Sequence, residues 1–270
     1  MKLIIAPTKY EGSMSLKRTT DDIEYIEENF PNVEIIDLGN NSVIDYLSQH
    51  NMCRKVKLMI NDPLFRVVEA EYGIIDEGKT AIIELSKTSG MGMIKEDEQN
   101  PMETSSYGTG EAIRDALDKG CRNFLIRLEN NATVDGGIGI LNALGVKFKD
   151  INNLPVNLTG KGMFDIEDID VRNLDPRALE SKFIIITKSS AVLSGIMGAS
   201  YSYAKAKGAN KLMVVALDRG LRKYSLIILN KFGIDIEHKE GAGAGGGIGG
   251  SLMTFLNSKF QRNVLIFNDK

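Results

Sequence analysis

The stretch EGAGAGGGIGGS at residues 240–251 holds seven glycines between Gly241 and Gly250. Glycine reaches positive φ without strain, so such a stretch can cradle a phosphate or let two backbones pass closely. It is not a P-loop, because Gly250 stands where the lysine of that motif belongs. A dinucleotide fingerprint is met at Gly241-x-Gly243-x-x-Gly246, but in so glycine-dense a stretch this match carries little information, and too few residues follow for a second βα unit. Two interpretations stay open, close packing before a helix and an anion site at that helix N-terminus.

The segment SLMTFLNS that follows has helical character, so we predict a helix that begins at about residues 249–251. We further expect the glycine backbone to line a cleft between two domains, because glycine density brings a ligand close to the main chain.

Asp135 is the candidate general base of the chain. Gly136 and Gly137 follow it, in a turn where a carboxylate can face a substrate hydroxyl. A second interpretation is equally open, in which Asp135 caps a helix that begins near Ile138. Lys188 follows an apolar strand and either contributes to an anion site or is a solvated surface lysine.

Composition excludes several classes of protein. The chain has 270 residues, 43% of them hydrophobic, a net charge of −3 and a pI near 5.6, which argues against a nucleic-acid surface. No apolar run approaches the roughly 20 residues of a membrane-spanning helix, and no signal peptide is recognisable. His50 and His238 have no partner at ligand spacing, so no metal site is expected. Cys53 and Cys121 are expected to be reduced thiols of a cytoplasmic protein.

Hydrophobic periodicity predicts two domains of different architecture. Residues 1–50 follow a β-α-β-α order, with strands at 2–6 and 33–38 and helices at 15–30 and 42–49. Ser42 is a plausible N-cap of the second helix. We therefore expect a truncated Rossmann-like domain in this part of the chain.

Residues 51–270 are expected to form a larger mixed-sheet α/β domain. Alternating apolar residues predict an antiparallel meander over 54–85, with a hairpin turn at DEG. Strands at 122–128 and 182–187 and a helix at 109–119 follow. The segment 212–217 suits either a strand or one face of a helix.

Five glycine-containing segments occur in a characteristic order: APTKYEGSMS, NPMETSSYGTGE, NNATVDGGIGIL, GIMGAS and GAGAGGGIGG. This series resembles the bacterial glycerate kinase family, whose chains begin APDSFKGS. DPLFRVVEAEYGII at 62–75 matches that family's GPLGEPVEAEYGIL, and the likeness runs to about residue 260. The combination is far more specific than any single motif.

The resemblance implies ATP-dependent phosphoryl transfer to glycerate by a two-domain α/β protein that uses Mg²⁺ and ATP. It also implies a long helix before the glycine stretch, which favours the helix at 212–217. Within the matching motifs, Asp135 is the catalytic candidate. The expected residues for binding substrate or phosphate are Ser13, Thr109, Thr133, Gly136, Gly137, Lys188, Gly243, Gly245 and Gly246.

Departures from the family fall on charged positions. Thr8 and Glu11 replace an aspartate and a lysine of the first loop, a shortened GNNS places Asn40 where an acidic loop is expected, and Lys188 replaces an acid. Glu11 would repel a phosphate charge 4 Å away by roughly 4 kcal/mol at an effective dielectric constant of about 20. We therefore expect phosphotransfer to be lost or impaired, with binding of a small anion or a partner retained.

Two other functions stay open. One is an active kinase for glycerate or a similar hydroxy acid, completed by a second chain, and the other is a structural or regulatory subunit without a ligand. The resemblance indicates a C-terminally truncated member, in which the chain ends before it can return to the first domain. Strand 2–6 or 33–38 would then present an unpaired edge, so we expect pairing with another copy or a partner chain.

Overall fold

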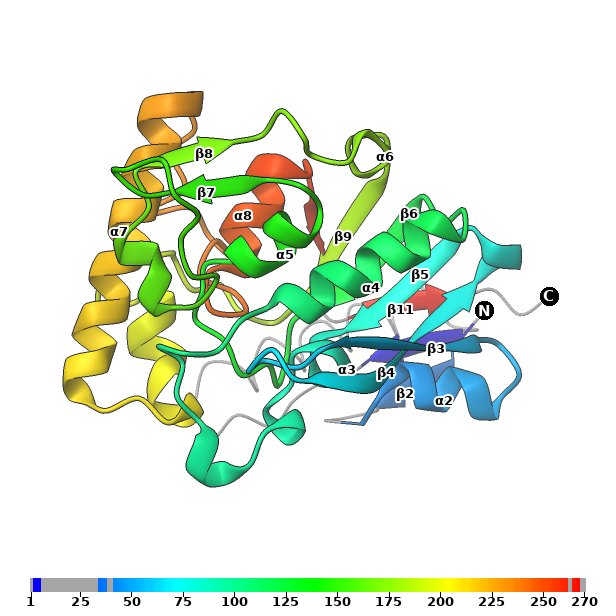
Figure 1. Ribbon diagram of the computed structural model, residues 1–270. Coiled ribbons are helices and arrows are strands. Elements are labelled where there is room, and N and C mark those ends of the chain that lie inside the picture. The colour runs from blue at the N-terminus through cyan, green and yellow to red at the C-terminus, as the bar shows by residue number, and fades with distance from the viewer. Residues whose placement is uncertain (1, 6–33, 38–40, 262–263, 268–270) are drawn as a thin grey trace.

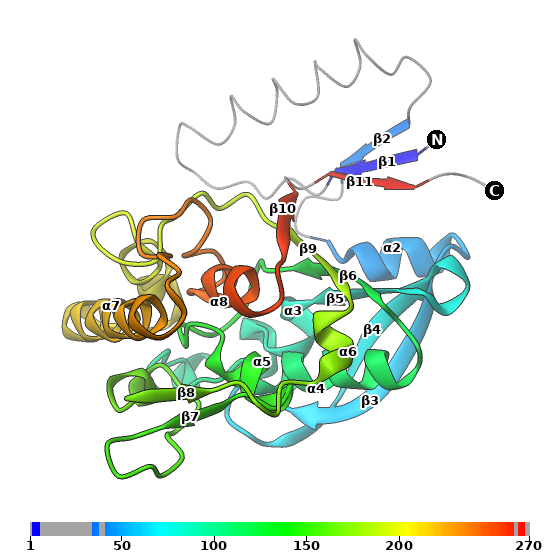
Figure 2. The ribbon, with the colours of Figure 1, turned by 90° about the horizontal axis from the view of Figure 1, so that it is seen from above.

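The first sheet contains the N-terminal strand of the chain. A computed structural model describes residues 2–5, 34–37, 41–261 and 264–267. β1 (Lys2–Ile5) pairs in parallel with β2 (Glu34–Asp37), which confirms both predicted strands. The helix predicted at 15–30 lies outside the described residues. In Figure 2 this small sheet lies to one side of the larger body, next to β10 (Lys259–Gln261).

β1 is not an edge strand, which corrects one expectation. β11 (Val264–Phe267) pairs antiparallel with it, so the sheet has the order β11-β1-β2. The apolar run of β11 has only four residues, too few to show the alternation that predicts a strand from sequence. The expectation that the chain ends before returning to this sheet is therefore wrong for β1, whose backbone is paired on both sides.

The main sheet has six strands in the order β10-β9-β6-β5-β4-β3. Its first part is the predicted meander, with antiparallel pairing of β3 to β4 and β4 to β5. The remaining pairs, β5-β6, β6-β9 and β9-β10, are parallel. The strands span β3 (Arg54–Asn61), β4 (Val67–Ile75), β5 (Thr80–Glu84), β6 (Asn123–Arg127) and β9 (Lys182–Ile186). A mixed α/β fold is thus confirmed.

Helices cover both faces of the main sheet (Figure 1). α2 (Val43–Gln49) packs its apolar side on one face, against Ile82 and Ile186, and Ser42 caps it as predicted. α4 (Tyr107–Asp118) and α5 (Ile138–Ala143) lie on the opposite face with Ile83 and Ile185. α2 belongs to the predicted first domain, and the boundary after residue 50 stays a prediction. The shorter elements are α3 (Leu85–Thr88), α6 (Pro176–Leu179), β7 (Lys147–Lys149) and β8 (Asp168–Asp170).

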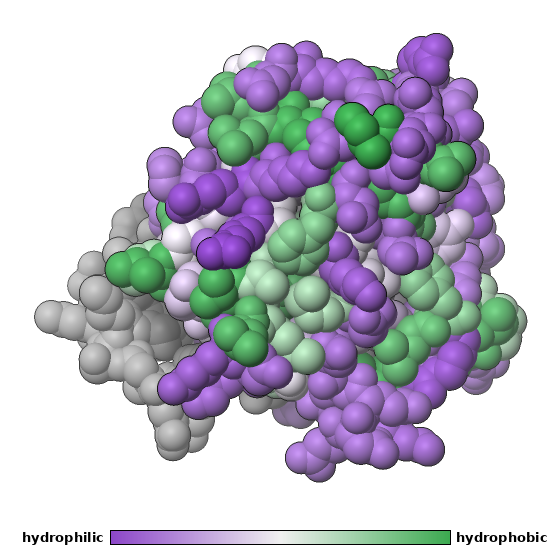
Figure 3. Space-filling view, turned by 60° about the vertical axis from the view of Figure 1, so that its left-hand side comes forward, coloured by the Kyte–Doolittle hydropathy of each residue, from purple (hydrophilic) through white to green (hydrophobic). Residues whose placement is uncertain are grey.

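The ambiguous segment 212–217 is helical, since α7 spans Lys211–Phe232. Leu217, Leu221, Tyr224 and Ile228 recur at helical spacing and are fully buried on its inner side. Figure 3 shows the face of the molecule that carries α7, where hydrophobic and hydrophilic residues alternate over the surface. β-branched content at the start of α7 is thus overridden by the periodicity of the whole segment.

Candidate functional site

A cavity of about 640 Å³ lies at the carboxyl ends of β6 and β9. Residues 128–131 follow β6 and residues 187–192 follow β9, and both segments line the cavity. Ser202, Tyr203, Ala206 and Lys207 add a third wall, and Gly245 contributes from the glycine stretch. Parallel strands place their following loops at one edge of the sheet, where ligands of open α/β folds bind. The cavity is therefore the candidate functional site.

The glycine stretch lets three loops meet beside the cavity. A Cβ on Gly246, where φ is +79°, would lie 2.1 Å from the Thr133 carbonyl oxygen. A Cβ on Gly243 would lie 2.0 Å from the Val192 carbonyl oxygen. α8 (Ile248–Phe255) follows, so the predicted helix is confirmed and starts slightly earlier than expected. Close packing explains Gly243 and Gly246, whereas Gly245 borders the cavity, where its role in anion binding stays a proposal.

Asp135 is fully buried between two helix starts. Its Oδ2 accepts hydrogen bonds from the Ser106 backbone N–H at 2.8 Å and from the Ser106 hydroxyl at 2.7 Å. Its Oδ1 accepts one from the Gly137 N–H at 3.0 Å. Burial raises the pKa of Asp135, although these donors oppose the shift. Since Ser106 caps α4 and Gly137 caps α5, this geometry supports the capping interpretation.

The other predicted residues hold the loops in place. Thr109 bonds the hydroxyls of Thr88 and Ser89 at 2.7 and 2.8 Å. The N–H of Gly136 donates to the Gly246 carbonyl at 3.1 Å, which joins the loop after β6 to the glycine stretch. Neither Thr109 nor Gly136 is among the described residues that line the cavity. Ser13 lies outside the described residues, as do Thr8, Glu11 and Asn40.

Lys188 does line the cavity, as the anion-site interpretation requires. It follows β9 directly, and its backbone N–H donates to Glu129 Oε1 at 3.3 Å. Ser189 stands next to it and shares a 2.5 Å hydrogen bond with the Tyr203 hydroxyl. A lysine, two hydroxyls and a carboxylate from three segments of the chain therefore meet in the lining of the site.

Sequence reasoning missed Lys207, Tyr203 and Glu129. Lys207 is only 8% exposed, and its Nζ donates to Asn131 Oδ1 and to the Thr133 carbonyl, both at 2.6 Å. The local sequence AKAKG carries no signal that separates this lysine from a solvated one. Burial raises the pKa of Glu129, although the Arg127 Nε lies 3.5 Å from its Oε2. Only contacts between distant segments distinguish these side chains.

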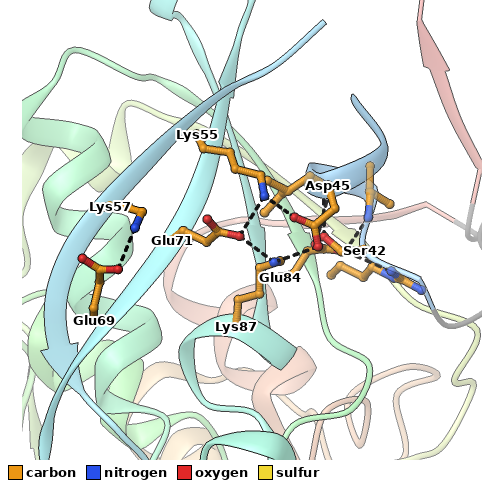
Figure 4. A network of polar contacts seen from close by, with 11 residues as sticks. Ser42, Asp45, Lys55, Lys57, Glu69, Glu71, Glu84 and Lys87 are labelled. Carbon is orange, nitrogen blue, oxygen red and sulfur yellow. Dashed lines mark hydrogen bonds and ion pairs between the residues drawn. The ribbon is translucent and has the colours of Figure 1, made fainter. Parts of the chain in front are cut away.

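A chain of charges connects the cavity to α2. Arg127 ends β6 and forms a buried ion pair with Glu84, with 2.9 Å between Nη1 and Oε1. Glu84 ends β5 and accepts hydrogen bonds from Ser42 Oγ and from the Val43 N–H, at the N-terminus of α2. Figure 4 shows Glu84 close to Ser42, beside a second cluster in which Asp45 lies between Lys55 and Lys87. The start of α2 is thereby held at the same sheet edge as the cavity.

Two features of the described residues bear on the kind of site. Within them, no group of three or more His, Cys, Asp or Glu side chains is arranged to hold a metal ion. Mg²⁺ in phosphotransfer sites is commonly held by one or two carboxylates together with phosphate oxygens, so the single carboxylate of Glu129 on the cavity fits that mode. None of the helices in the described part combines the length and the apolarity needed to cross a membrane.

Comparisons with known proteins agree with this architecture. The model of the glycerate kinase family matches residues 3–269. Glycerate 2-kinase of Escherichia coli is 33% identical over 271 residues, which cover 98% of this chain and 71% of that protein. Glycerate kinase of Bacillus subtilis is 31% identical over 98% of this chain and 70% of its own length. A crystal structure described as "putative glycerate kinase 2 from Salmonella typhimurium LT2" superposes with a TM-score of 0.80 at 30% identity, over 97% of this chain and 72% of that one.

Proposed function

This chain belongs to the glycerate kinase family, and we propose on that basis that it is an active kinase, which transfers a phosphoryl group from ATP to glycerate or a similar small hydroxy acid. Relatives named glycerate kinases align with nearly the whole of this chain. The observation that carries the proposal is a cavity of about 640 Å³ with two lysines in its walls, at the sheet edge where α/β folds bind ligands.

The residues of the cavity fit the requirements of phosphoryl transfer. Catalysis of this reaction depends on positioning and on cations placed against phosphate oxygens. Lys188 and Lys207 supply cationic side chains, and Ser189 supplies a hydroxyl. Mg²⁺ bound with ATP would neutralise phosphate charge, with Glu129 as the candidate carboxylate on the protein side. The chain's own part is to orient the acceptor and to exclude water.

The competing interpretation, a family member that has lost phosphotransfer, rests on four positions. Thr8, Glu11 and Asn40 lie outside the described residues, so nothing in the described geometry sets them against a phosphate. Lys188 is the fourth, and it replaces an acid with a cation that suits an anion site. The named activity of the relatives therefore favours the active kinase.

A direct assay separates the interpretations. The purified chain is incubated with Mg·ATP and glycerate while ADP release is followed, and we expect turnover in the usual range of about 1–10³ s⁻¹. Lys188→Met should lower kcat/KM by roughly 10²–10³, because one preorganised charge is lost. Lys182→Met is the matched control, since that exposed lysine starts the same strand β9. Its rate should equal that of the unchanged chain.

Absence of ADP release would favour the impaired family member. Thermal-shift titrations with Mg·ADP and with glycerate would then separate a retained binding protein from a subunit without a ligand, because only binding to the native state raises the midpoint.

A cytoplasmic location and self-association are further proposals. β1 is paired on both sides, so β2 and β11 are the two edge strands of the described small sheet, and of these β2 is the strand we expect to pair with a copy or a partner chain. Light scattering at micromolar concentration tests this, and a monomer with an ordered β2 would refute it.

A further inference from the structure

We propose that Lys207 forms an anion-binding subsite in the wall of the cavity, where its side-chain nitrogen receives a carboxylate or phosphate oxygen of the ligand. This inference rests on the proposed function, which places an anionic substrate in the same cavity. It differs from the expectation based on sequence, which assigned the cationic role to Lys188.

Geometry holds the Lys207 nitrogen in one place. Two of its N–H groups point at neutral acceptors, Asn131 Oδ1 and the Thr133 carbonyl, each at 2.6 Å. Both acceptors belong to the loop after β6, and Asn131 also lines the cavity. An ammonium group has three donors, so one N–H is left for which residues 41–261 offer no hydrogen-bond acceptor. That third donor is suited to a ligand.

The charge around Lys207 is also incomplete. Its side chain is nine-tenths buried, yet none of the ion pairs among the described residues includes it. A buried charge is normally paired, because taking an unpaired ion out of water is costly. Asp135, behind the cavity wall, is the carboxylate whose charge acts on Lys207, and Glu129, Lys188 and Tyr203 are the other titratable groups that line the cavity. A bound anion would supply the missing opposite charge.

Binding should therefore be coupled to a proton. Burial lowers the pKa of Lys207 to about 7, against the partial opposing effect of Asp135. Above that pH most molecules hold a neutral amine, and an anion in contact with it favours the ammonium form. Anion binding near pH 8 should then take up roughly one proton, and affinity should weaken as the pH rises above 7.

Titration calorimetry tests the subsite with three probes: glycerate, inorganic phosphate and Mg·ADP. Glycerate reports a carboxylate at the subsite, and the other two report a phosphate. Lys207→Met should weaken at least one probe by roughly 10-fold or more, the usual effect of removing a hydrogen bond to a charged group. Lys205→Met is the matched control, because Lys205 is exposed on the same short helix, and it should bind within about 2-fold of the unchanged chain.

Two results would overturn the proposal. One is a folded Lys207→Met protein that binds all three probes with unchanged affinity, which would leave Lys207 with only a structural role in holding the loop. The other is an unchanged chain that binds none of the probes. If Lys207→Met does not fold, proton uptake by the unchanged chain decides the question. It is measured with each probe that binds, at pH 8 in two buffers of different ionisation enthalpy, and zero uptake with all of them refutes the proposal.

These results are separable from the proposed function. ADP release with glycerate, together with unchanged affinities in Lys207→Met, refutes the subsite and leaves the kinase activity standing. Anion binding that depends on Lys207, without ADP release, supports the subsite and refutes the kinase.

Discussion

The buried pair between Glu84 and Arg127 should be the most stability-sensitive contact near the cavity. Glu84 is 1% exposed and Arg127 is 5% exposed, and 2.9 Å separates their charged atoms. Glu84→Gln keeps the size of the side chain but leaves the guanidinium buried beside a neutral amide. The amide nitrogen also faces donors where the carboxylate accepted hydrogen bonds from Ser42 and from the Val43 N–H, 3.0 Å away.

Removing one partner of a buried ion pair costs about 3–5 kcal/mol when the other charge is left without a counter-ion. Arg127 keeps the Glu129 carboxylate 3.5 Å from its Nε, so we expect the lower end of that range, about 3 kcal/mol. For a chain of this size each kcal/mol shifts the melting temperature by about 2–4 °C. Glu84→Gln should therefore lower the melting temperature by roughly 6–12 °C. The loss is a large part of the about 5–15 kcal/mol that typically separates folded from unfolded chains.

Glu69→Gln is the matched control. It makes the same chemical change in the pair with Lys57, at 2.8 Å, where the side chains are 60% and 68% exposed (Figure 4). Solvent screens that pair, so its melting temperature should equal that of the unchanged chain. Calorimetry and urea unfolding of both variants check the comparison. Equal shifts for the two variants would show that the Glu84 pair does not hold α2 on the sheet.

Three further perturbations have definite outcomes. Gly246→Ala should destabilise the fold strongly, because its Cβ would meet a backbone carbonyl oxygen 2.1 Å away. Gly195→Ala is also at positive φ but has open space around it, so it should cost only about 1–2 kcal/mol. Equal losses of stability in urea unfolding of the two variants would contradict this. Ser251→Ala should cost about 1–3 kcal/mol by leaving its buried partners unsatisfied, among them the Tyr224 hydroxyl at 2.7 Å, and a urea midpoint that does not move would refute the role. Burial raises the pKa of Cys53 to about 11, so the folded chain should alkylate there at pH 8 far more slowly than the urea-unfolded chain, as peptide mass spectrometry can measure.

Local patterns identified most of the elements that build the site. Alternating apolar residues gave the meander of β3 to β5, and the DEG turn lies between β4 and β5 as predicted. Ser42 caps α2 because its side-chain oxygen accepts a hydrogen bond from a backbone N–H of the first turn, which has no partner within the helix. Donor and acceptor lie within four residues of each other, so the sequence alone predicts this contact. The order of the glycine-containing motifs identified the family. Each motif is a short stretch of sequence, so it can be recognised without knowledge of the tertiary structure.

Contacts across the chain decided which side chains form the site. Lys207 donates a hydrogen bond to Asn131, which lies 76 residues earlier in the sequence, and Glu84 pairs with Arg127, which lies 43 residues later. The sequence around Lys207 is that of a solvated lysine, and the pairing of β1 with β11 joins the two ends of the described chain. Secondary structure follows from neighbours a few residues apart, so the sequence reveals it. The burial of a side chain, its charge partner and its pKa shift depend on residues that are distant in the sequence. These residues come into contact only when the chain folds.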